Sequence, residues 1–301
     1  MELAFRFFVW GSLWKVDYGA APRIQFNDKQ RTSIEPPPWL RPDVAVFEDL
    51  LGIGFFHYGP RLWMVGEVEP LKALQEKNTQ AAVIARIMRE YPVRTIGPAT
   101  LLYRIRKEPS DPAAPCEYDS PPEGVAGSGR LDSPGNPVLY ASPDLQVCVH
   151  ECRVTAEDQL YVATLVPTRD LRLLDMSVLL KEDVTEFESL DMAVHMLFLA
   201  GTHSYAISRE ITVAGREEGL DGIVYPSYFS MLRNGVMPFQ TVYGISNRRI
   251  PQFQPYEEAC AVPNLAIFGH PVQDGRIEVK CINKLVLSRV SYEFRFGPVA
   301  F

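Results

Sequence analysis

Short β-favouring runs alternate along the middle of the chain with segments whose apolar residues recur every three or four positions. The runs that predict strands lie at 101–107, 138–141, 160–166, 171–174 and 223–225. The amphipathic segments that predict helices lie at 69–76, 79–91, 143–152, 189–200 and 204–218. Beyond residue 240, further strands are expected at 240–243, 278–282 and 285–292. This mixture of helices and strands predicts an α+β fold with mixed sheets and flanking helices.

The ends of the predicted helices carry start and stop signals. Pro70 stands at a first helical position and Pro92 ends the following helix, while Ser189 is expected to cap a third helix and Gly219 to end a fourth.

The first hundred residues carry a weaker pattern than the rest of the chain. Residues 1–60 are rich in aromatic residues and proline and indicate only a strand at 5–13 and a helix at 44–51. With the helices between 69 and 91, we predict a partly helical N-terminal region over residues 1–100 that serves packing or dimerisation. A lid over a site is the alternative.

The stretch 127–153 is the densest in signals. A brief strand ends at Ser142, which is expected to cap the next helix, with Pro143 at its first position. Glu151 falls at the edge of the apolar stripe of this helix, where a carboxylate can face a cleft; an ordinary surface glutamate is the alternative. The stripe consists of Leu145, Cys148, Val149 and Cys152.

Composition bounds the class of protein. With 301 residues, of which 47% are hydrophobic, the chain can bury a sizeable core. The net charge of −7 and the lack of a clustered basic face argue against a nucleic-acid surface. Five cysteines without a CxxC motif favour a reducing compartment, so we expect a cytoplasmic protein. The longest uncharged stretch, 192–208, is too short and too polar for a membrane span.

Two groups of residues suggest a metal site, but neither has suitable spacing. Cys148, His150 and Cys152 offer ligand atoms, yet positions two apart on a helix point to different faces, so we expect no metal. The acidic patch is more typical of a solvated surface than of a calcium loop. It consists of Glu182, Asp183, Glu186, Glu188 and Asp191.

Four motifs in order resemble the RES-domain family. Leu102-Tyr103-Arg104 is similar to the family's opening strand, and Gly129-Arg130 with Ser133-Pro134-Gly135 is similar to its GR-x-x-P-x-G turn. Tyr140 and Glu151 have the family's tyrosine-to-glutamate spacing, and the segment 221–227, DGIVYPS, is similar to its dGi-x-yPS strand end. The resemblance covers about 101–244. Leu131, Asp132 and Ile105 depart from it, since an aromatic residue, an asparagine and, in some members, a tyrosine are usual there.

The resemblance implies a fold and an activity. Family members have a fold like that of ADP-ribosyltransferases and degrade NAD, and several are toxins of toxin–antitoxin pairs. We therefore expect a RES-like catalytic domain over 101–301 after the N-terminal extension. NAD would be a substrate, so no cofactor is expected, while a cognate antitoxin or immunity protein and a second copy of the chain are the expected protein partners.

The resemblance also implies roles for particular residues. Glu151 would stabilise the positive charge that develops when the nicotinamide–ribose bond breaks, and Arg130, the second catalytic residue, would bind the pyrophosphate together with Arg104. Tyr140 would stack on or hydrogen-bond the nicotinamide end. Ser227 would bond the amide or a ribose hydroxyl, with Ser208 as a second choice.

Three readings of the activity stay open at this point. The leading one is cleavage of NAD by a glycohydrolase that uses water or by a phosphorylase that uses phosphate. Transfer of ADP-ribose to a protein is the second. The third is a catalytically silent RES-like scaffold that serves assembly.

Overall fold

The computed structural model describes residues 68–122, 127, 129–155, 157–185, 188–199, 204–227, 229–230, 241–242, 245–246, 248, 251–252 and 254–287. The strand at 5–13 and the helix at 44–51 lie outside these residues, and so does most of the strand expected at 285–292.

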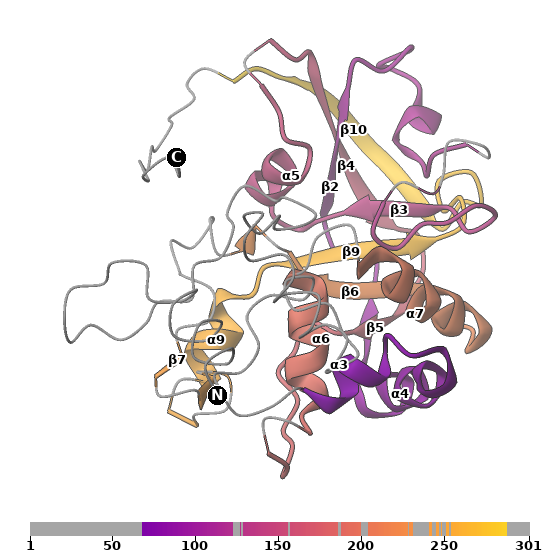
Figure 1. Ribbon diagram of the computed structural model, residues 1–301. Coiled ribbons are helices and arrows are strands. Elements are labelled where there is room, and N and C mark those ends of the chain that lie inside the picture. Colours follow the sequence, from indigo (N-terminus) through magenta and orange to yellow (C-terminus); the bar gives the residue numbers. More distant parts are fainter. Residues whose placement is uncertain are drawn as a thin grey trace, which may run out of the picture.

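Two sheets form the centre of the molecule (Figure 1). The five-stranded sheet has the order β1 (Val93–Ile96), β5 (Leu171–Asp175), β6 (Gly222–Pro226), β9 (Pro263–Phe268) and β3 (Val138–Ala141). Only β5 and β6 pair in parallel. The antiparallel three-stranded sheet has the order β10 (Ile277–Leu285), β4 (Leu160–Pro167) and β2 (Leu102–Lys107). A bridge between Tyr103 and Ser142 joins the two sheets, and β7 (Thr241–Val242) and β8 (Ile245–Ser246) form a separate pair.

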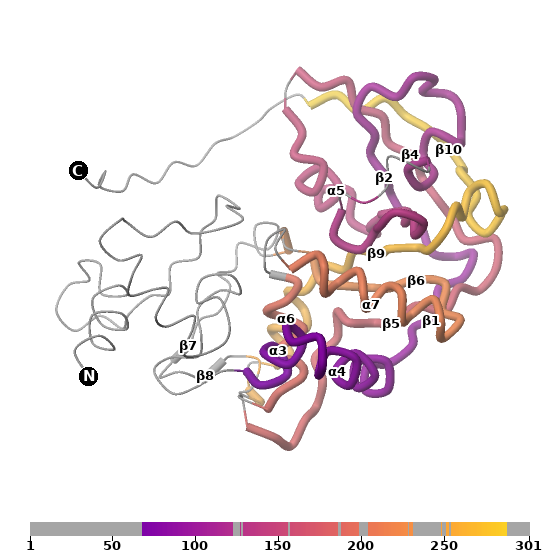
Figure 2. The backbone as a smooth tube through the Cα atoms, turned by 45° about the vertical axis from the view of Figure 1, so that its right-hand side comes forward, coloured from indigo at the N-terminus to yellow at the C-terminus, as the bar shows by residue number. Residues whose placement is uncertain are grey.

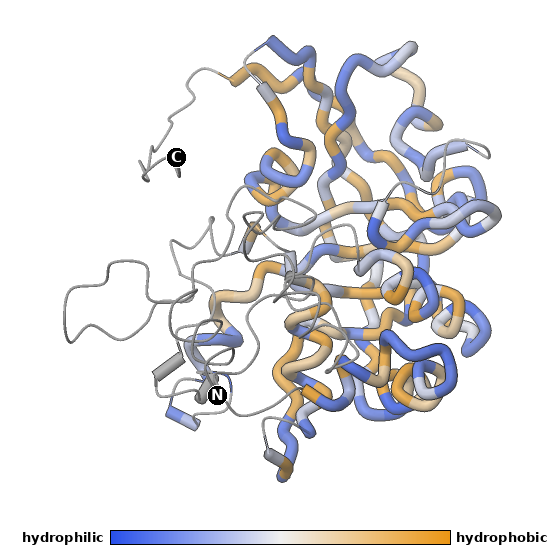
Figure 3. Tube along the Cα trace, viewed as in Figure 1, coloured by the Kyte–Doolittle hydropathy of each residue, from blue (hydrophilic) through white to orange (hydrophobic). Residues whose placement is uncertain are grey.

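Helices cover one face of the five-stranded sheet, and the second sheet covers the other (Figures 1 and 2). The helices on that face are α3 (Glu69–Ala73), α4 (Lys77–Glu90), α6 (Leu190–Leu199) and α7 (Tyr205–Glu217). Successive side chains of β6 point to opposite faces of the sheet and therefore belong to different cores. Ile223 packs with the helices, and Val224 packs with the three-stranded sheet. Figure 3 shows hydrophobic residues concentrated in α6 and the strands. The α+β fold is therefore confirmed.

The region before residue 101 is continuous with this fold where it is described. β1 pairs with β5 over four residues, and Val83 and Ile87 of α4 share a core with Leu197 and Ile211. Residues of α4 and β1 thus pack against elements that follow residue 101, while the role of the whole region 1–100 in packing or dimerisation stays a prediction.

Four elements in the described ranges have no counterpart in the predictions, besides the 3-10 turn η2 (Pro115–Tyr118). They are the strands β1, β8 and β9 and the helix α9 (Gln254–Cys260). β9 matters most, since it lies between β6 and β3 and connects the two halves of the sheet. Its apolar run from Leu265 to Phe268 is the signal that identifies a buried strand.

The acidic patch was wrongly expected to be solvated throughout. Asp191 is 1% exposed and forms an ion pair with the buried Arg248 at 2.7 Å. The Glu182 carboxylate accepts hydrogen bonds from the backbone N–H groups of Leu190 and Asp191 at the start of α6. Ser189 caps this helix as predicted, by accepting a bond from the Met192 N–H. Unpaired N–H groups of the first helical turn therefore bind Glu182, whereas Arg248 neutralises Asp191.

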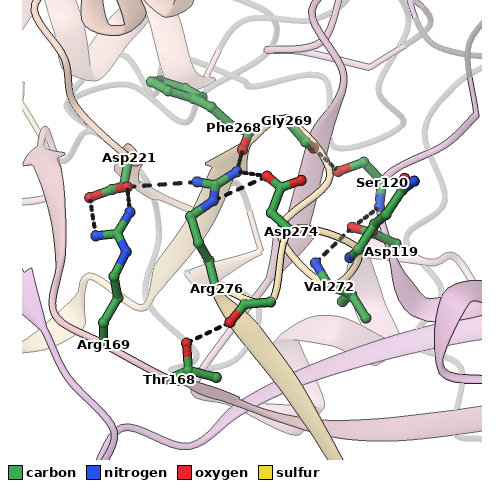
Figure 4. Close-up of polar contacts among 12 residues, drawn as sticks. Asp119, Ser120, Thr168, Arg169, Asp221, Phe268, Gly269, Val272, Asp274 and Arg276 are labelled. Atoms are coloured by element: carbon green, nitrogen blue, oxygen red, sulfur yellow. Dashed lines mark hydrogen bonds and ion pairs between the residues drawn. The ribbon is translucent and has the colours of Figure 1, made fainter.

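Asp221, the first residue of the DGIVYPS motif, holds the strand connections in place (Figure 4). Its carboxylate pairs with Arg169 at 2.7 Å and Arg276 at 3.6 Å, and it accepts a bond from the Arg172 N–H. The next residue, Gly222, allows β6 to approach β9, because a Cβ there would lie 2.3 Å from the Ala266 carbonyl oxygen. These two motif residues thus fix the strand that leads to Ser227.

Candidate active site

Glu151 is the last residue of the short helix α5 (Leu145–Glu151). The cap of this helix is Asp144, whose carboxylate accepts a bond from the Val147 N–H at 3.0 Å, so the expectation that Ser142 caps it was wrong. Ser142 instead donates to the Pro263 carbonyl oxygen, and it accepts a bond from the Asp144 N–H. The start of the helix is thereby tied to β9.

The thiol of Cys148 holds the same helix against the second sheet. It donates to the Tyr103 carbonyl oxygen at 3.2 Å, and the side chain packs with Ile105 and Val162. Burial raises the pKa of Cys148 to about 12, so this thiol stays protonated and acts as a small apolar residue. Glu151 therefore ends a helix with a fixed position.

Two buried side chains orient the carboxylate of Glu151. Its Oε1 accepts one hydrogen bond from Ser227 Oγ and one from Asn264 Nδ2, each at 2.6 Å. Ser227 is 2% exposed and Asn264 is 4% exposed, whereas Glu151 is exposed. Both bonds go to Oε1, so Oε2 accepts no hydrogen bond from the part of the chain that the structure describes. The result is a carboxylate with one oxygen held and the other open.

One face of the five-stranded sheet carries the residues beside this carboxylate. Tyr225 of β6 lies directly across from Asn264 of β9, and Tyr140 of β3 lies across from Ala266. Because side chains two residues apart on a strand point to the same face, Tyr140, Tyr225 and Asn264 share it. Ser227 follows Tyr225 by two positions at the end of β6.

The Tyr140 hydroxyl shapes the turn that carries Arg130. It accepts bonds from the N–H groups of Leu131 and Asp132 and donates to Asp132 Oδ1 at 2.9 Å. Burial raises the pKa of Tyr140, and the neighbouring Asp132 carboxylate raises it further. A Cβ at Gly129 would lie 2.0 Å from Asp132 Oδ1, so a larger residue there would displace the Asp132 carboxylate. The hydroxyl is thus engaged within the turn, and contact of Tyr140 with nicotinamide stays a prediction for its ring.

Arg130 lies between two helices. Its Nη1 donates to the Leu197 carbonyl oxygen at 3.1 Å and to Ser204 Oγ at 3.4 Å, and its guanidinium lies 5.7 Å from the Phe198 ring centroid and 4.8 Å from that of Tyr205. These contacts hold the half-buried cation by hydrogen bonds and by the faces of aromatic rings.

Arg209 is a second cation at this turn, and the sequence provided no signal for it within its helix. Its guanidinium lies 5.9 Å from the Tyr205 ring centroid, and its Nη2 donates to the carbonyl oxygens of Gly127 and Gly129, each at 2.8 Å. Arg130 and Arg209 therefore lie around one aromatic ring.

Tyr225 connects the acid to the arginine. Its ring stacks on Phe198, with centroids 5.2 Å apart, and Phe198 is also a ring beneath Arg130. Burial raises the pKa of the Tyr225 hydroxyl well above its ordinary value, the charge of Glu151 adds to this effect, and Arg130 opposes it. Tyr225 thus lies between Phe198, whose ring contacts Arg130, and Asn264, which donates to Glu151.

Two predicted site residues, Arg104 and Ser208, are buried within the fold. Arg104 is 8% exposed and donates to the carbonyl oxygens of Tyr140 and Asp119, at 2.8 and 2.9 Å, so its donors link β2 to β3 and to the segment after η2. Burial, together with the charge of Arg106, lowers the pKa of Arg104 to about 10. Ser208 is fully buried in α7 and donates to the Ser204 carbonyl oxygen. The geometry gives both residues structural contacts.

Among the described residues, no group of three or more histidine, cysteine, aspartate or glutamate side chains has the geometry of a metal site. His150 instead stacks on Phe229, with ring centroids 5.8 Å apart. Within the same ranges, no helix is long and apolar enough to cross a membrane.

A comparison of the sequence with curated proteins finds no significant match. Among solved structures, the chain is similar to a chain of the crystal structure of the M. tuberculosis MbcT–MbcA toxin–antitoxin complex, with 14% identity and a TM-score of 0.38. The match covers 67% of this chain and 91% of that chain. The family model of the RES domain matches residues 101–243, a segment that includes Arg130, Tyr140, Glu151 and Ser227. The chain therefore contains a RES domain, which spans residues 101–243.

Proposed function

We propose that this protein cleaves the bond between nicotinamide and ribose in NAD. The observation that carries the proposal is the carboxylate of Glu151, which Ser227 and Asn264 hold through Oε1. Tyr225 lies next to Asn264, and its ring stacks on Phe198, which contacts Arg130. A bound carboxylate next to a half-buried guanidinium matches a substrate that develops positive charge at one end and carries phosphates at the other.

The chemistry requires a fixed negative charge. When the C–N bond breaks, its electron pair leaves with nicotinamide, which departs as a neutral ring, and the ribose becomes an oxocarbenium-like cation. The open Oε2 of Glu151 stabilises that cation or accepts a bond from a ribose hydroxyl. Because Ser227 and Asn264 already hold Oε1, little reorganisation of the carboxylate is needed during the reaction.

The pyrophosphate requires planar, fixed donors, which Arg130 supplies. Its position between the Phe198 and Tyr205 rings restricts the guanidinium before substrate binds, and this restriction lowers the entropic cost of binding. Arg209 on the same Tyr205 ring adds positive charge nearby. We assign pyrophosphate binding to Arg130 and not to Arg104, because the Arg104 guanidinium is buried and bonded to backbone carbonyl oxygens.

The RES domain is also the basis for the biological role that we propose. An enzyme that depletes NAD would harm the cell that makes it, so we propose that the protein is a toxin and that a cognate antitoxin covers its site.

The test is to incubate the full-length protein with NAD and to separate the products by chromatography with mass detection. Nicotinamide with ADP-ribose identifies water as the acceptor, and nicotinamide with phosphorylated ADP-ribose in phosphate buffer identifies phosphate. Added mass on a co-incubated protein identifies transfer. Intact NAD under all three conditions would contradict the proposal and favour the silent scaffold.

A further inference from the structure

We propose that the Tyr225 hydroxyl is a substrate-binding group, which donates a hydrogen bond to a hydroxyl of the ribose next to the scissile bond. This inference rests on the proposed function and adds a residue to its site.

The first observation is an unused polar group in a nearly closed position. Tyr225 is 7% exposed, yet within the described part of the chain its hydroxyl forms no hydrogen bond. The hydroxyl oxygen is not among the fully buried atoms that lack a partner, so it remains accessible to solvent. The other tyrosine of this sheet face, Tyr140, instead uses its hydroxyl in three hydrogen bonds within the protein. The Tyr225 hydroxyl thus has a bonding capacity that an external ligand can use.

The second observation is the position of the side chain beside the held carboxylate. Tyr225 is the cross-strand neighbour of Asn264, and it precedes Ser227 by two residues on the same face. These two neighbours are the residues that donate to Glu151 Oε1. A substrate whose ribose contacts the carboxylate therefore lies next to the Tyr225 side chain.

The third observation is the orientation of the ring. Stacking on Phe198, at 5.2 Å between centroids, fixes the ring plane, and Phe198 in turn contacts the Arg130 guanidinium. The ring of Tyr225 is thereby held between Phe198 and the strand position next to Asn264. The opposite effects of the Glu151 and Arg130 charges on the pKa of this hydroxyl agree with that placement.

A donor in this place suits a ribose hydroxyl better than a phosphate. The raised pKa keeps the Tyr225 hydroxyl protonated, so it donates. Arg130 is the charged donor proposed for the phosphates, whereas the neutral donors Ser227 and Asn264 are directed at Glu151 Oε1, so Tyr225 adds a neutral donor for the ribose. A hydrogen bond from Tyr225 would hold the ribose while its ring gains positive charge.

The test compares the wild type with Tyr225→Phe on NAD and on two analogues, each lacking one hydroxyl of the nicotinamide ribose. We expect Tyr225→Phe to lower kcat/KM for NAD roughly three- to tenfold, the value of one neutral hydrogen bond. We also expect this penalty to disappear for the analogue that lacks the contacted hydroxyl. The midpoint of thermal unfolding should stay unchanged, because the substitution removes a hydroxyl that forms no hydrogen bond within the described chain.

The matched control is Tyr118→Phe, which removes a tyrosine hydroxyl that donates to the Pro112 carbonyl oxygen in the other core. It should cost stability and leave kcat/KM unchanged. An unchanged kcat/KM in Tyr225→Phe, or the same penalty on NAD and on both analogues, would overturn the inference while the proposed function stands. A wild type that releases no nicotinamide overturns both.

Discussion

Ser227 donates a hydrogen bond of 2.6 Å to Oε1 of Glu151, although 76 residues separate the two side chains in the sequence. The serine follows a strand of the five-stranded sheet, and the glutamate ends a helix that packs on the three-stranded sheet. Their contact therefore links the five-stranded sheet to the helix that packs on the three-stranded sheet. The position of the Glu151 carboxylate depends on both sheets.

Replacing Glu151 by Gln removes the negative charge and keeps a side chain of the same size. We expect the rate of nicotinamide release to fall at least about 100-fold, because electrostatic stabilisation of the transition state is lost. The midpoint of thermal unfolding should change little, since Glu151 is exposed. Glu157→Gln, an exposed carboxylate shortly after the same helix, is the control and should retain activity. Equal rates in the two variants would remove Glu151 from the mechanism.

Ser227 and Asn264 donate to the same oxygen, so each is expected to compensate partly for loss of the other. Ser227→Ala and Asn264→Ala should each lower kcat by roughly three- to tenfold with little change in KM, in line with one hydrogen bond. The double variant should lose more than the product of the two effects, because Oε1 then has neither donor. Steady-state kinetics of the four proteins measures this coupling. Strictly multiplicative effects would show that the two residues act independently of each other.

Arg130 and Arg104 should respond differently to the same substitution by Met. Arg130→Met should raise the dissociation constant for NAD, which calorimetry can measure in the Glu151→Gln background. Arg104→Met leaves the carbonyl oxygens of Tyr140 and Asp119 without their donor, so the free energy of unfolding should fall by about 2–4 kcal/mol. The folded Arg104→Met protein should bind NAD with unchanged affinity. Weakened binding without loss of stability would restore the original role predicted for Arg104.

His195 makes the stability of the fold depend on pH. Burial lowers the pKa of His195 well below 6.5, and the charge of Arg248 lowers it further. The unfolded chain binds the proton more tightly than the folded chain, so this contribution to stability is present above pH 6.5 and is lost as the pH falls below it. The associated slope is up to about 1.4 kcal/mol per pH unit.

Urea unfolding at pH 7 and pH 5 tests this dependence. His195→Gln should lose less stability between the two pH values than the wild type does. Met196→Leu, a volume-conserving change at a buried neighbour in α6, is the control and should keep the wild-type difference. Equal pH dependence in His195→Gln and the wild type would exclude His195 as its source.

Local patterns were sufficient for most elements and for part of the site. The four helices on the sheet face and the strands β2 to β6 follow from hydrophobic periodicity and from proline and glycine signals, which act within a few residues. The start of α5 was misplaced by two residues, because Ser142 and Asp144 both suit a cap and only the bond of Ser142 to Pro263 decides between them.

The sequence did not distinguish residues of the same type that have different environments in the structure. Arg104 and Arg130 both belong to motifs, yet burial turns one toward backbone carbonyls and leaves the other between two aromatic rings. Tyr140 and Tyr225 both lie on strands, yet the first bonds within a turn and the second keeps its hydroxyl unbonded within the described chain. Such differences depend on neighbours that are distant in the sequence.

The sequence by itself determined the α+β class and the order of the central elements, since periodicity is a local property of the chain. Its resemblance to the RES-domain family identified Arg130, Tyr140, Glu151 and Ser227 as candidates. Only the tertiary structure decided that Asn264 shares Oε1 of Glu151 with Ser227, that Tyr225 lies beside them, and that Arg104 is internal. The physical reason is strand register. Pairing of β6 with β9 places residues about forty positions apart on one sheet face, and no local pattern encodes which residues meet there.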